Sequence, residues 1–371
     1  MMANRLRFDL FCRVVDNYGD AGVCWRLARE LVAGHGIDVA LRIDRLEALA
    51  RIEPALDAAR AVQRVAGVAV HALDETAAAP RLPDVVIEAF GCGLPKPWLE
   101  AMAAAARKPL WINLEYLSAE AWVDQAHALP SPQPRLPLVR YFWFPGFTGR
   151  TGGLIRERDL FARRDAWRAR HSRGEGVLRV VLFAYENAAL PALLEHWAGG
   201  SQDVVCAIPE TVAARSVASW LGHPLDRASG PVERGALVLE SVPFTNQDGF
   251  DRLLWSSDVN FVRGEDSFVR AQWAARPFAW QPYRQSGDAH LAKLRAFLDR
   301  YAKALAPDAA RALVAFSFAY NREDAARIGD AWDALATHRA AIADHARHFA
   351  DVLASGPELC ASLVEFARGR L

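Results

Sequence analysis

Short runs of apolar residues alternate with longer segments of helical spacing through the first half of the chain. The longer segments repeat apolar residues four positions apart, as at Val23, Leu27 and Leu31, and are expected to be helices. Strand–helix alternation of this kind predicts a parallel α/β sheet, whose buried strands read as near-continuous apolar runs. The runs that fit such strands are Phe8–Val15, Ile37–Ile43, Val68–His71, Asp84–Phe90 and Pro109–Leu114.

The same alternation begins again in the second half, and after about residue 288 the chain is expected to be mostly helical. The pattern therefore predicts two doubly wound α/β domains of similar size. Ligands bind at the carboxyl ends of parallel strands, so we expect the site in a cleft where two such edges face each other. The expected strands of the second sheet are Leu178–Ala184, Asp203–Ile208, Leu237–Val242, Asp258–Val262 and Phe278–Gln281.

Two segments bear on the domain boundary. Leu129–Pro137 has four prolines within eight residues, which excludes a helix or a central strand and predicts a rigid loop. The polar stretch Arg170–Gly176 is the expected linker. We therefore expect a first domain over residues 1–165 and a second over 170–349. The C-terminal residues 350–371, which include the amphipathic segment Pro357–Arg368, are expected to pack back on the first domain.

The composition excludes several classes of protein. Among 371 residues, 52% are hydrophobic and 24% are charged, which is globular and not disordered or collagen-like. Lys and Arg total 44, as do Asp and Glu, so no basic field indicates a nucleic-acid partner. No apolar stretch approaches the roughly 18–20 residues of a membrane span. The five cysteines are scattered and form no C-x-x-C, which fits reduced thiols in a cytoplasmic protein.

The first candidate for chemistry is the turn within Phe11–Arg26, between the first strand and the first helix. Gly19 and a second glycine three residues later permit a tight turn and close backbone approach. Asp16 and Asp20 flank that turn. In a purely structural interpretation Asp20 caps the helix; in a functional one, a carboxylate here is a general base or a cation anchor. The turn lacks G-x-G-x-x-G, so NAD binding is not supported.

A second strand–glycine–helix junction follows the strand that ends near residue 262. Glu265, Asp266 and Ser267 could simply be N-cap and first-turn residues. The exposed amides of such a turn would also hold a diphosphate, with Arg263 or Arg270 neutralising its charge. Two acids beside a phosphate are awkward unless they bind hydroxyl groups. The junction therefore favours a nucleotide-sugar over a bare phosphate.

Two further strand ends carry aromatic residues. Tyr185 could stack on a base or donate to a phosphate, or it could be a rim residue of the core. In the loop Val242–Phe250, Phe244 and Gln247 could frame a planar base, while Asn246 would serve as a helix cap. Both interpretations of both segments stay open on the sequence alone.

Several motifs are absent. The chain has no P-loop, no D-x-D pair of the kind many sugar transferases use to chelate a metal, no H-E-x-x-H and no G-x-S-x-G. His338, His345 and His348 fall on one late helical stretch and are expected to form a solvated face rather than a metal site.

Four long blocks resemble a known family, the bacterial protein-arginine rhamnosyltransferases (EarP) that modify translation elongation factor P. The similarity extends over nearly the whole chain. The blocks are FCRVVDNYGDAGVCWRLARE (11–30), WINLEYLSAE (111–120), YFWFPGFTGRTGGLIRERDL (141–160) and VRGEDSFVRAQWAARPFAWQPY (262–283). One visible departure is Ala21, where the family usually has isoleucine.

The resemblance implies a GT-B fold, with two Rossmann-like domains facing across the active-site cleft. It implies transfer of rhamnose from dTDP-β-L-rhamnose to one arginine of elongation factor P, with inversion and without a metal or other cofactor. The first domain would bind the acceptor and the second the nucleotide-sugar. The alternatives are a GT-B transferase with another donor or acceptor, or a binding module without turnover.

The resemblance also implies roles for individual residues. Asp20 matches the family's proposed general base, and Asp16 matches the other essential aspartate and would orient the guanidinium. Two carboxylates suit this acceptor, because a guanidinium has a pKa of roughly 13 and is a poor nucleophile while protonated. The implied donor-binding residues, with Gly19 and Arg270 added from the turn and junction above, are Phe183, Tyr185, Phe244, Gln247, Glu265, Asp266, Ser267, Arg270 and Gly19.

Overall fold

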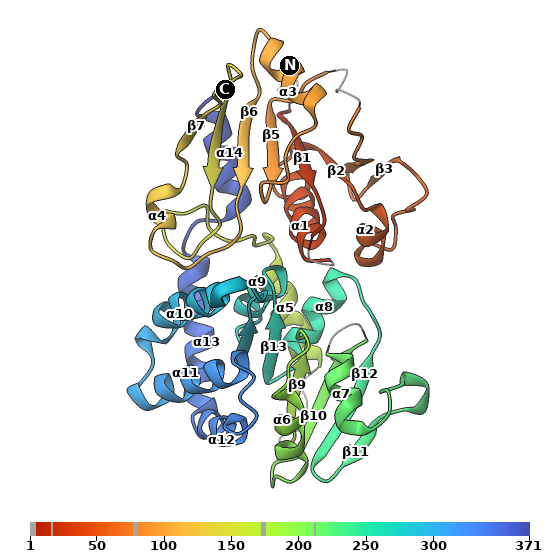
Figure 1. Ribbon diagram of the computed structural model, residues 1–371, viewed down its shortest axis with the longest axis vertical. Coiled ribbons are helices and arrows are strands. Elements are labelled where there is room, and N and C mark those ends of the chain that lie inside the picture. The colour runs from red at the N-terminus through yellow and green to blue at the C-terminus, as the bar shows by residue number, and fades with distance from the viewer. Residues whose placement is uncertain (1–4, 16–17, 77–80, 172–175, 211–212) are drawn as a thin grey trace. The chain divides into compact units, whose positions relative to one another are not determined.

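A computed structural model describes residues 5–15, 18–76, 81–171, 176–210 and 213–371. The chain forms two compact units (Figure 1). Unit 1 comprises Met1–Arg158 and Leu353–Leu371, and unit 2 comprises Asp159–Val352. Both termini of the chain therefore belong to unit 1. Of the segment Arg170–Gly176, predicted as the linker, residues 172–175 lie outside the described part.

Unit 1 is built on an eight-stranded sheet, counted over the described residues, with the order β3-β4-β2-β1-β5-β6-β8-β7. All neighbouring pairs are parallel except the two edge pairs, β3–β4 and β7–β8. Its strands are β1 (Arg7–Cys12), β2 (Asp38–Ile43), β3 (Val62–Val65), β4 (Val68–Ala72), β5 (Val85–Ala89), β6 (Leu110–Leu114), β7 (Pro130–Pro132) and β8 (Val139–Trp143). Its helices are α1 (Gly19–Ala33), α2 (Leu46–Ile52), α3 (Lys96–Ala104), α4 (Val123–Ala126) and α14 (Leu359–Arg368).

Unit 2 contains a six-stranded sheet within its described residues, with the order β11-β12-β10-β9-β13-β14. Only the edge strand β11 is antiparallel to its neighbour. Its strands are β9 (Leu178–Leu182), β10 (Val204–Pro209), β11 (Val232–Arg234), β12 (Leu237–Val242), β13 (Val259–Arg263) and β14 (Phe278–Gln281). Its helices are α5 (Leu160–Arg170), α6 (Leu190–Ala198), α7 (Ala214–Leu221), α8 (Gln247–Trp255), α9 (Asp266–Ala274), α10 (Ala289–Tyr301), α11 (Pro307–Asn321), α12 (Ile328–Thr337) and α13 (Arg339–Ala354).

The sheet order confirms the predicted doubly wound α/β class, and all ten predicted strands are present. In unit 1 the chain moves outward from β1 to β2 and then crosses to β5 on the other side of β1. In unit 2 it moves from β9 to β10 and later crosses to β13. These crossings are topological switch points, where the loops after neighbouring strands diverge and leave a crevice for a ligand.

The prediction of a loop throughout Leu129–Pro137 was wrong in part. Pro130–Pro132 pairs antiparallel with β8 as the outermost strand, with Ser131 opposite Arg140. Prolines are tolerated there because an edge strand leaves one row of backbone positions without a partner. The exclusion of a helix and of a central strand was right.

The C-terminal segment completes unit 1. Phe366 of α14 packs against Trp143 of β8, with ring centroids 4.8 Å apart. Leu154 forms an isolated parallel bridge with Glu358, whose carboxylate accepts hydrogen bonds from the first amides of α14. Gly153 has a φ of +79°, and a Cβ there would lie 2.0 Å from the Pro357 carbonyl oxygen. Only glycine therefore fits this approach of two backbones.

Arginines of α5 attach this helix to the rest of unit 2. The Arg164 guanidinium donates to the Trp273 carbonyl at 2.9 Å, and Arg168 donates to the carbonyls of Trp255 and Ala274. These acceptors belong to the last turns of α8 and α9, whose carbonyls lack partners within their own helices. Cations also interact favourably with the negative end of a helix dipole. The arginine-rich sequence of α5 is thus explained in part by docking.

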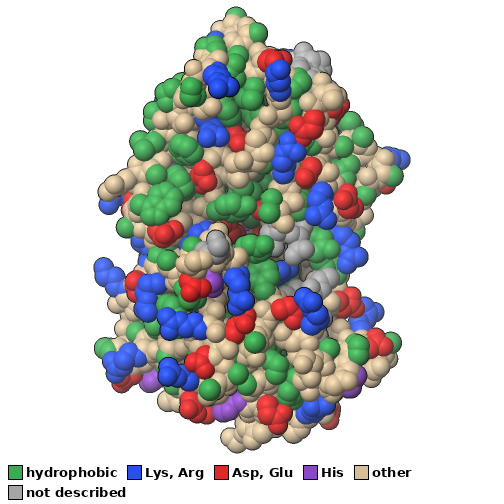
Figure 2. Space-filling model, viewed as in Figure 1, with side chains coloured by type: hydrophobic (Ala, Val, Ile, Leu, Met, Phe, Trp, Pro, Cys, Tyr) green, Lys and Arg blue, Asp and Glu red, His purple; other side chains and the backbone are tan. Residues whose placement is uncertain are grey.

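Among the described helices, none combines the length and the apolar character that crossing a membrane requires. Figure 2 shows basic and acidic side chains interspersed over the visible face, in keeping with equal numbers of the two kinds in the sequence.

Candidate active site

Asp20 lies in the first turn of α1, the helix that follows the switch-point strand β1. Its side chain is 4% exposed, and its Oδ2 accepts a hydrogen bond from the Val15 backbone N–H at 2.8 Å. The residue at the N-cap position of α1 is Tyr18, without a side-chain capping bond. Asp20 is therefore not the helix cap; it reaches back to the loop that leaves β1. This bond fixes the carboxylate at the carboxyl edge of the sheet. Asp16, predicted beside it, lies outside the described residues.

Glu115 and Tyr116 stand at the same edge of unit 1, directly after β6, and sequence reasoning missed them. Burial raises the pKa of the Glu115 carboxyl, and the nearby Arg140 opposes this shift. Tyr116 stacks on Phe90 with ring centroids 4.5 Å apart, and Phe90 has a strained φ of +57°. Glu115 and Tyr116 belong to the family-like block 111–120, and this membership could have indicated them from the sequence.

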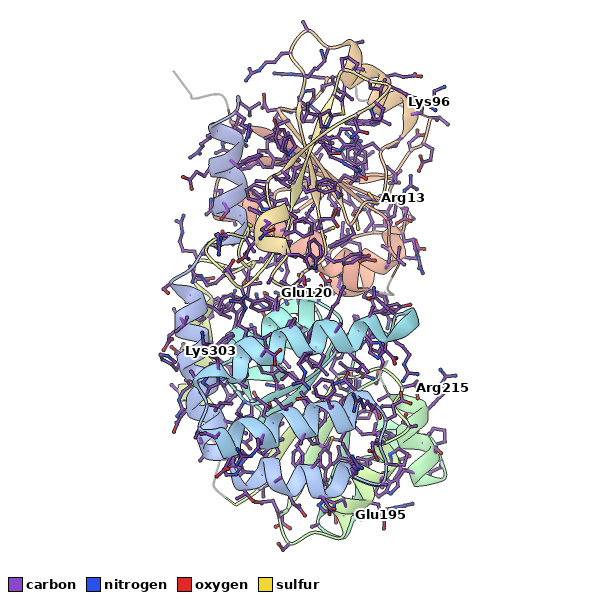
Figure 3. All side chains as sticks on the ribbon, turned by 60° about the vertical axis from the view of Figure 1, so that its left-hand side comes forward. Arg13, Lys96, Glu120, Glu195, Arg215 and Lys303 are labelled. Atoms are coloured by element: carbon purple, nitrogen blue, oxygen red, sulfur yellow. The ribbon has the colours of Figure 1, made fainter. Side chains whose placement is uncertain are left out.

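Other charged residues at this edge stabilise loops. The Arg13 guanidinium donates to the Cys92 carbonyl at 2.9 Å, and the Ser118 hydroxyl donates to Glu120 at 2.8 Å (both charged residues are labelled in Figure 3). Buried Glu88 accepts from the Gly93 amide and from the indole of Trp111. These contacts hold the loops after β1, β5 and β6 in place.

In unit 2 the Arg263 guanidinium joins two predicted aromatic residues. It lies 4.9 Å from the ring centroid of Phe183 and 4.5 Å from that of Tyr185. The Tyr185 backbone N–H donates to Gln281 Oε1 at 2.9 Å, which connects the ends of β9 and β14. Phe183 also packs against Phe250 of α8, with centroids 4.8 Å apart. Strand ends distant in sequence thus form one cation–aromatic cluster at the second switch point.

The junction after β13 differs from the simple capping interpretation. Gly264 turns the chain with a φ of +59°, and α9 begins at Asp266 with Glu265 at its N-cap position and no side-chain capping bond. Ser267 instead bonds the strand end: its hydroxyl accepts from the Arg263 amide at 3.0 Å and donates to the Arg263 carbonyl. Glu265 and Asp266 are half-buried at this helix N-terminus.

The loop before α8 contains the other predicted base-binding residues. Asn246 caps α8 by accepting from the Gly249 amide at 2.9 Å, which confirms that part of the prediction. Gln247 is the first residue of α8 and is buried, and Phe244 is half-buried in the preceding loop. Since Phe250 lies one turn later and contacts Phe183, the start of α8 belongs to the same edge as the Arg263 cluster.

Arg270 is held within unit 2 by a buried carboxylate. Its Nε and Nη2 bond the two oxygens of Asp251 on α8, at 2.9 and 2.7 Å. This bidentate pair connects α8 with α9 and so fixes the two helices that begin at the candidate donor site.

Potential metal ligands do not gather in the described part of the chain: no group of three His, Cys, Asp or Glu side chains is arranged to hold an ion there. The expectation that His338, His345 and His348 form a solvated face was wrong for His345. That ring is buried against Tyr301, with centroids 4.7 Å apart. Burial lowers the pKa of His345 because its charged form loses hydration.

Comparison with known proteins decides the family. The family model described as elongation factor P (EF-P) rhamnosyltransferase EarP matches residues 8–368. The chain belongs to the EarP family. A protein-arginine rhamnosyltransferase of Pseudomonas putida is 46% identical over 376 residues, covering 98% of this chain and 99% of that protein. Its counterpart from Shewanella oneidensis is 40% identical over 390 residues, covering 99% and 98%.

Solved structures agree with the EarP assignment. A solved structure that is described as showing the structural basis for EarP-mediated arginine glycosylation of translation elongation factor EF-P matches this chain with a TM-score of 0.69. It is 35% identical and covers 99% of this chain and 100% of that one. MurG of Acinetobacter baumannii and the calicheamicin glycosyltransferase CalG4 match at 10% and 15% identity, with TM-scores of 0.52 and 0.51. Each match covers 99% of this chain and 100% of the other, and both show the fold alone. The chain is a glycosyltransferase with the predicted GT-B fold.

Proposed function

We propose that this protein transfers rhamnose from dTDP-β-L-rhamnose to an arginine side chain of translation elongation factor P. Membership of the EarP family supports the acceptor and the sugar. The observation that carries the chemistry is the buried Asp20 carboxylate, fixed by the Val15 amide at the unit 1 switch point. Because the acceptor is a translation factor, the proposed location is the cytoplasm.

In the proposed reaction, a guanidinium nitrogen of the acceptor attacks the anomeric carbon of rhamnose. The bond between that carbon and the diphosphate oxygen breaks, and dTDP leaves with the electron pair. The attacking nitrogen loses one proton, which Asp20 accepts as general base. A single displacement of this kind inverts the anomeric centre. Asp16 is proposed to orient the guanidinium, and Gly19 to allow close approach of the donor sugar.

The acceptor side of the proposed site is the carboxyl edge of unit 1. A guanidinium binds favourably to carboxylates and to aromatic faces. Asp20 offers a carboxylate. At the same sheet edge, Glu115 offers a second carboxylate and the Phe90–Tyr116 stack offers an aromatic face. We assign Glu115 and Tyr116 to acceptor binding on this ground.

The donor side is the carboxyl edge of unit 2. Phe183, Tyr185, Phe244 and Gln247 are proposed to hold the thymidine part. The amides at the start of α9 are proposed to hold the diphosphate, since a helix N-terminus attracts anions and can take the place of a metal. Glu265, Asp266 and Ser267 would contact hydroxyl groups or order this turn. Arg270 is proposed to hold α8 and α9 in position and not to contact the donor, because its guanidinium is paired with Asp251.

The test is the intact mass of elongation factor P after incubation with the enzyme and dTDP-β-L-rhamnose. The informative variant is Asp20→Asn, whose amide oxygen can still accept from Val15. Asp44→Asn is its matched control, because the Asp44 carboxylate also accepts a hydrogen bond from a backbone amide of this loop, that of Val14, at 3.0 Å. A gain of one deoxyhexose with wild type and Asp44→Asn, but not with Asp20→Asn, supports the proposal.

A folded wild-type enzyme that adds no mass to its cognate elongation factor P would contradict the proposed acceptor or donor. A panel of nucleotide-sugars would then separate the alternatives of another donor and another acceptor. Binding of nucleotide-sugars without turnover on any acceptor would indicate the non-catalytic alternative. Turnover that stops in the presence of EDTA would contradict metal independence.

A further inference from the structure

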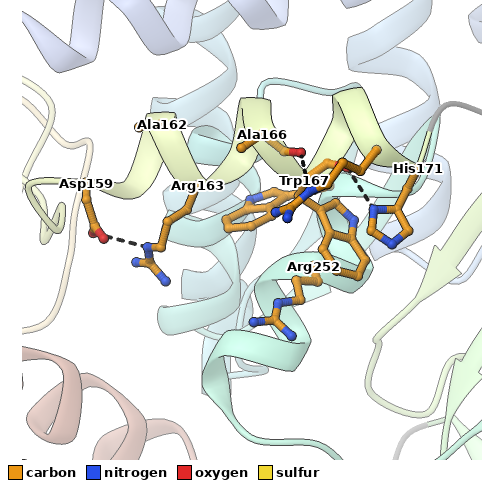
Figure 4. Close-up of a pocket in the computed structure, with 9 residues that line it drawn as sticks. Asp159, Ala162, Arg163, Ala166, Trp167, His171 and Arg252 are labelled. Carbon is orange, nitrogen blue, oxygen red and sulfur yellow. Dashed lines mark hydrogen bonds and ion pairs between the residues drawn. The ribbon is translucent and has the colours of Figure 1, made fainter.

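A surface groove on unit 2 lies between α5 and α8 and continues onto one face of the sheet. Its first part has a volume of about 550 Å³ and is lined by α5 residues and by Arg252 and Trp255 of α8 (Figure 4). Its second part, of about 360 Å³, is lined by residues of α8, β9, β10 and β12. Trp167 and Arg252 line both parts, so the two are continuous.

The arginines of the groove differ in how their charge is balanced. Arg163 bonds Asp159 at 3.1 Å and lies 3.7 Å from Asp248, so carboxylates of unit 2 already neutralise it. Within the part of the chain that the structure describes, Arg170 donates to a backbone carbonyl alone, that of Ala166 at 3.1 Å. The Arg252 guanidinium lies over the Trp167 ring, 5.2 Å from its centroid.

A fourth arginine, Arg179 at the start of β9, lines the second part of the groove. Among the described residues, no carboxylate forms an ion pair with Arg170, Arg179 or Arg252. Two other arginines of α5, Arg164 and Arg168, instead bond the ends of α8 and α9. Glu240 of β12 also lines the second part, so in the described structure these three arginines of the groove face one carboxylate and the groove keeps a net positive charge.

The floor of the second part is mostly apolar. Val181, Val205, Ala207 and Val242 line it on the sheet face beside Glu240, with Leu253 of α8 on its wall. Val205 and Ala207 are only half-buried, so this face is not fully covered within the described structure. A mostly apolar floor beside a net positive charge fits a segment that carries both carboxylates and an apolar side chain.

We propose that this groove binds an acidic segment of a partner protein. Its carboxylates would lie on Arg170, Arg179 and Arg252, and an apolar side chain would lie on the valine floor. A single-stranded nucleic acid fits less well, because it requires aromatic faces on which bases stack. The ring of Trp167 is stacked with His171, with centroids 3.6 Å apart, and Arg252 lies over it as well.

The probe is a fluorescent peptide of about twelve residues that repeats Glu-Glu-Leu, followed by fluorescence anisotropy with the full-length protein. Matched peptides replace Glu by Gln or Leu by Ser, and a single-stranded DNA of similar length tests the nucleic-acid alternative. The key variant is Arg170→Glu/Arg252→Glu. Arg322→Glu is its control, since exposed Arg322 likewise lies over an aromatic ring, 5.1 Å from the Phe318 centroid.

The proposal expects the Glu-Glu-Leu peptide to bind and the double variant to weaken binding by about tenfold or more. The Gln and Ser peptides should bind more weakly, and Arg322→Glu should bind as wild type does. Unchanged thermal unfolding of the double variant would show that the fold is intact. The proposal is overturned if the peptide does not bind, if both arginine variants reduce binding equally, or if DNA binds the groove in preference.

Discussion

The Arg270 guanidinium and the Asp251 carboxylate form an ion pair whose two side chains are each 1% exposed. A buried pair of this kind gives little net stability, because both charges have lost their hydration. Breaking it is costly, since one charge then remains buried without its partner. The pair joins α8 to α9, and both helices begin at the proposed donor site.

Arg270→Met should therefore destabilise the protein by about 3–5 kcal/mol in urea unfolding, because the Asp251 carboxylate stays buried. The double variant Arg270→Met/Asp251→Leu should regain most of this loss. Equal stability of the single and double variants would contradict the assignment. If Arg270 only holds α8 and α9 in position, the affinity of the double variant for dTDP should be nearly that of wild type. A large loss of affinity there would instead indicate direct contact with the diphosphate.

Arg263→Met should weaken dTDP binding by about tenfold, which is about 1.4 kcal/mol. The expected cause is loss of the cation that lies against the rings of Phe183 and Tyr185 and stands next to the turn proposed to bind the diphosphate. Isothermal titration calorimetry measures the change directly. Arg295→Met is the control, because Arg295 lies 4.4 Å from the Phe318 ring centroid on another part of unit 2. Equal losses in both variants would count against a donor role for Arg263.

Glu30 predicts a pH dependence of stability within unit 1. Burial, followed by the negative charges of Glu358 and Glu157, raises the pKa of Glu30 from 4.5 to about 7. The folded state therefore holds this proton more tightly than the unfolded state does. The free energy of unfolding contributed by Glu30 is fully present below pH 4.5 and is lost as pH rises through about 7.

Glu30→Gln should accordingly be more stable than wild type at pH 8, by on the order of 2 kcal/mol. The advantage should shrink as pH falls and vanish near the unfolded pKa. Thermal unfolding over this pH range measures it, with Glu47→Gln on the exposed side of α2 as the control. A difference that does not depend on pH would refute the explanation.

Gly153→Ala should destabilise unit 1 by about 1–3 kcal/mol, since alanine would need a left-handed φ and would meet the Pro357 carbonyl. Hydrogen exchange should rise first in α14, which follows this contact. Gly149→Ala is the matched control in the same loop, because a Cβ there meets nothing within 4 Å. Equal protection of α14 in both variants would show that the contact is dispensable.

Apolar runs such as Val85–Ala89 predicted the central strands because every residue of such a strand is buried. β8 was missed because most of its residues are only half-buried, which weakens the apolar signal. Ser267 shows a second limit: a serine at a helix start can cap the helix or bond the preceding strand, and the same letters fit both. The clustering of Phe183 and Tyr185 around Arg263 depends on pairing between strands about 80 residues apart, which local pattern cannot show.

The discontinuous construction of unit 1 has a consequence for biosynthesis. The strand β8 and the segment around Gly153 rest on residues that the ribosome adds only after unit 2, Pro357 and Phe366 among them. Unit 2, by contrast, is complete once Val352 has been added. During translation the unit that carries Asp20 is therefore incompletely packed until unit 2 and the residues that follow it have left the exit tunnel. We therefore expect unit 1, which begins before unit 2 in the chain, to finish folding after it, and a product that stops at Val352 to lack a completed unit 1.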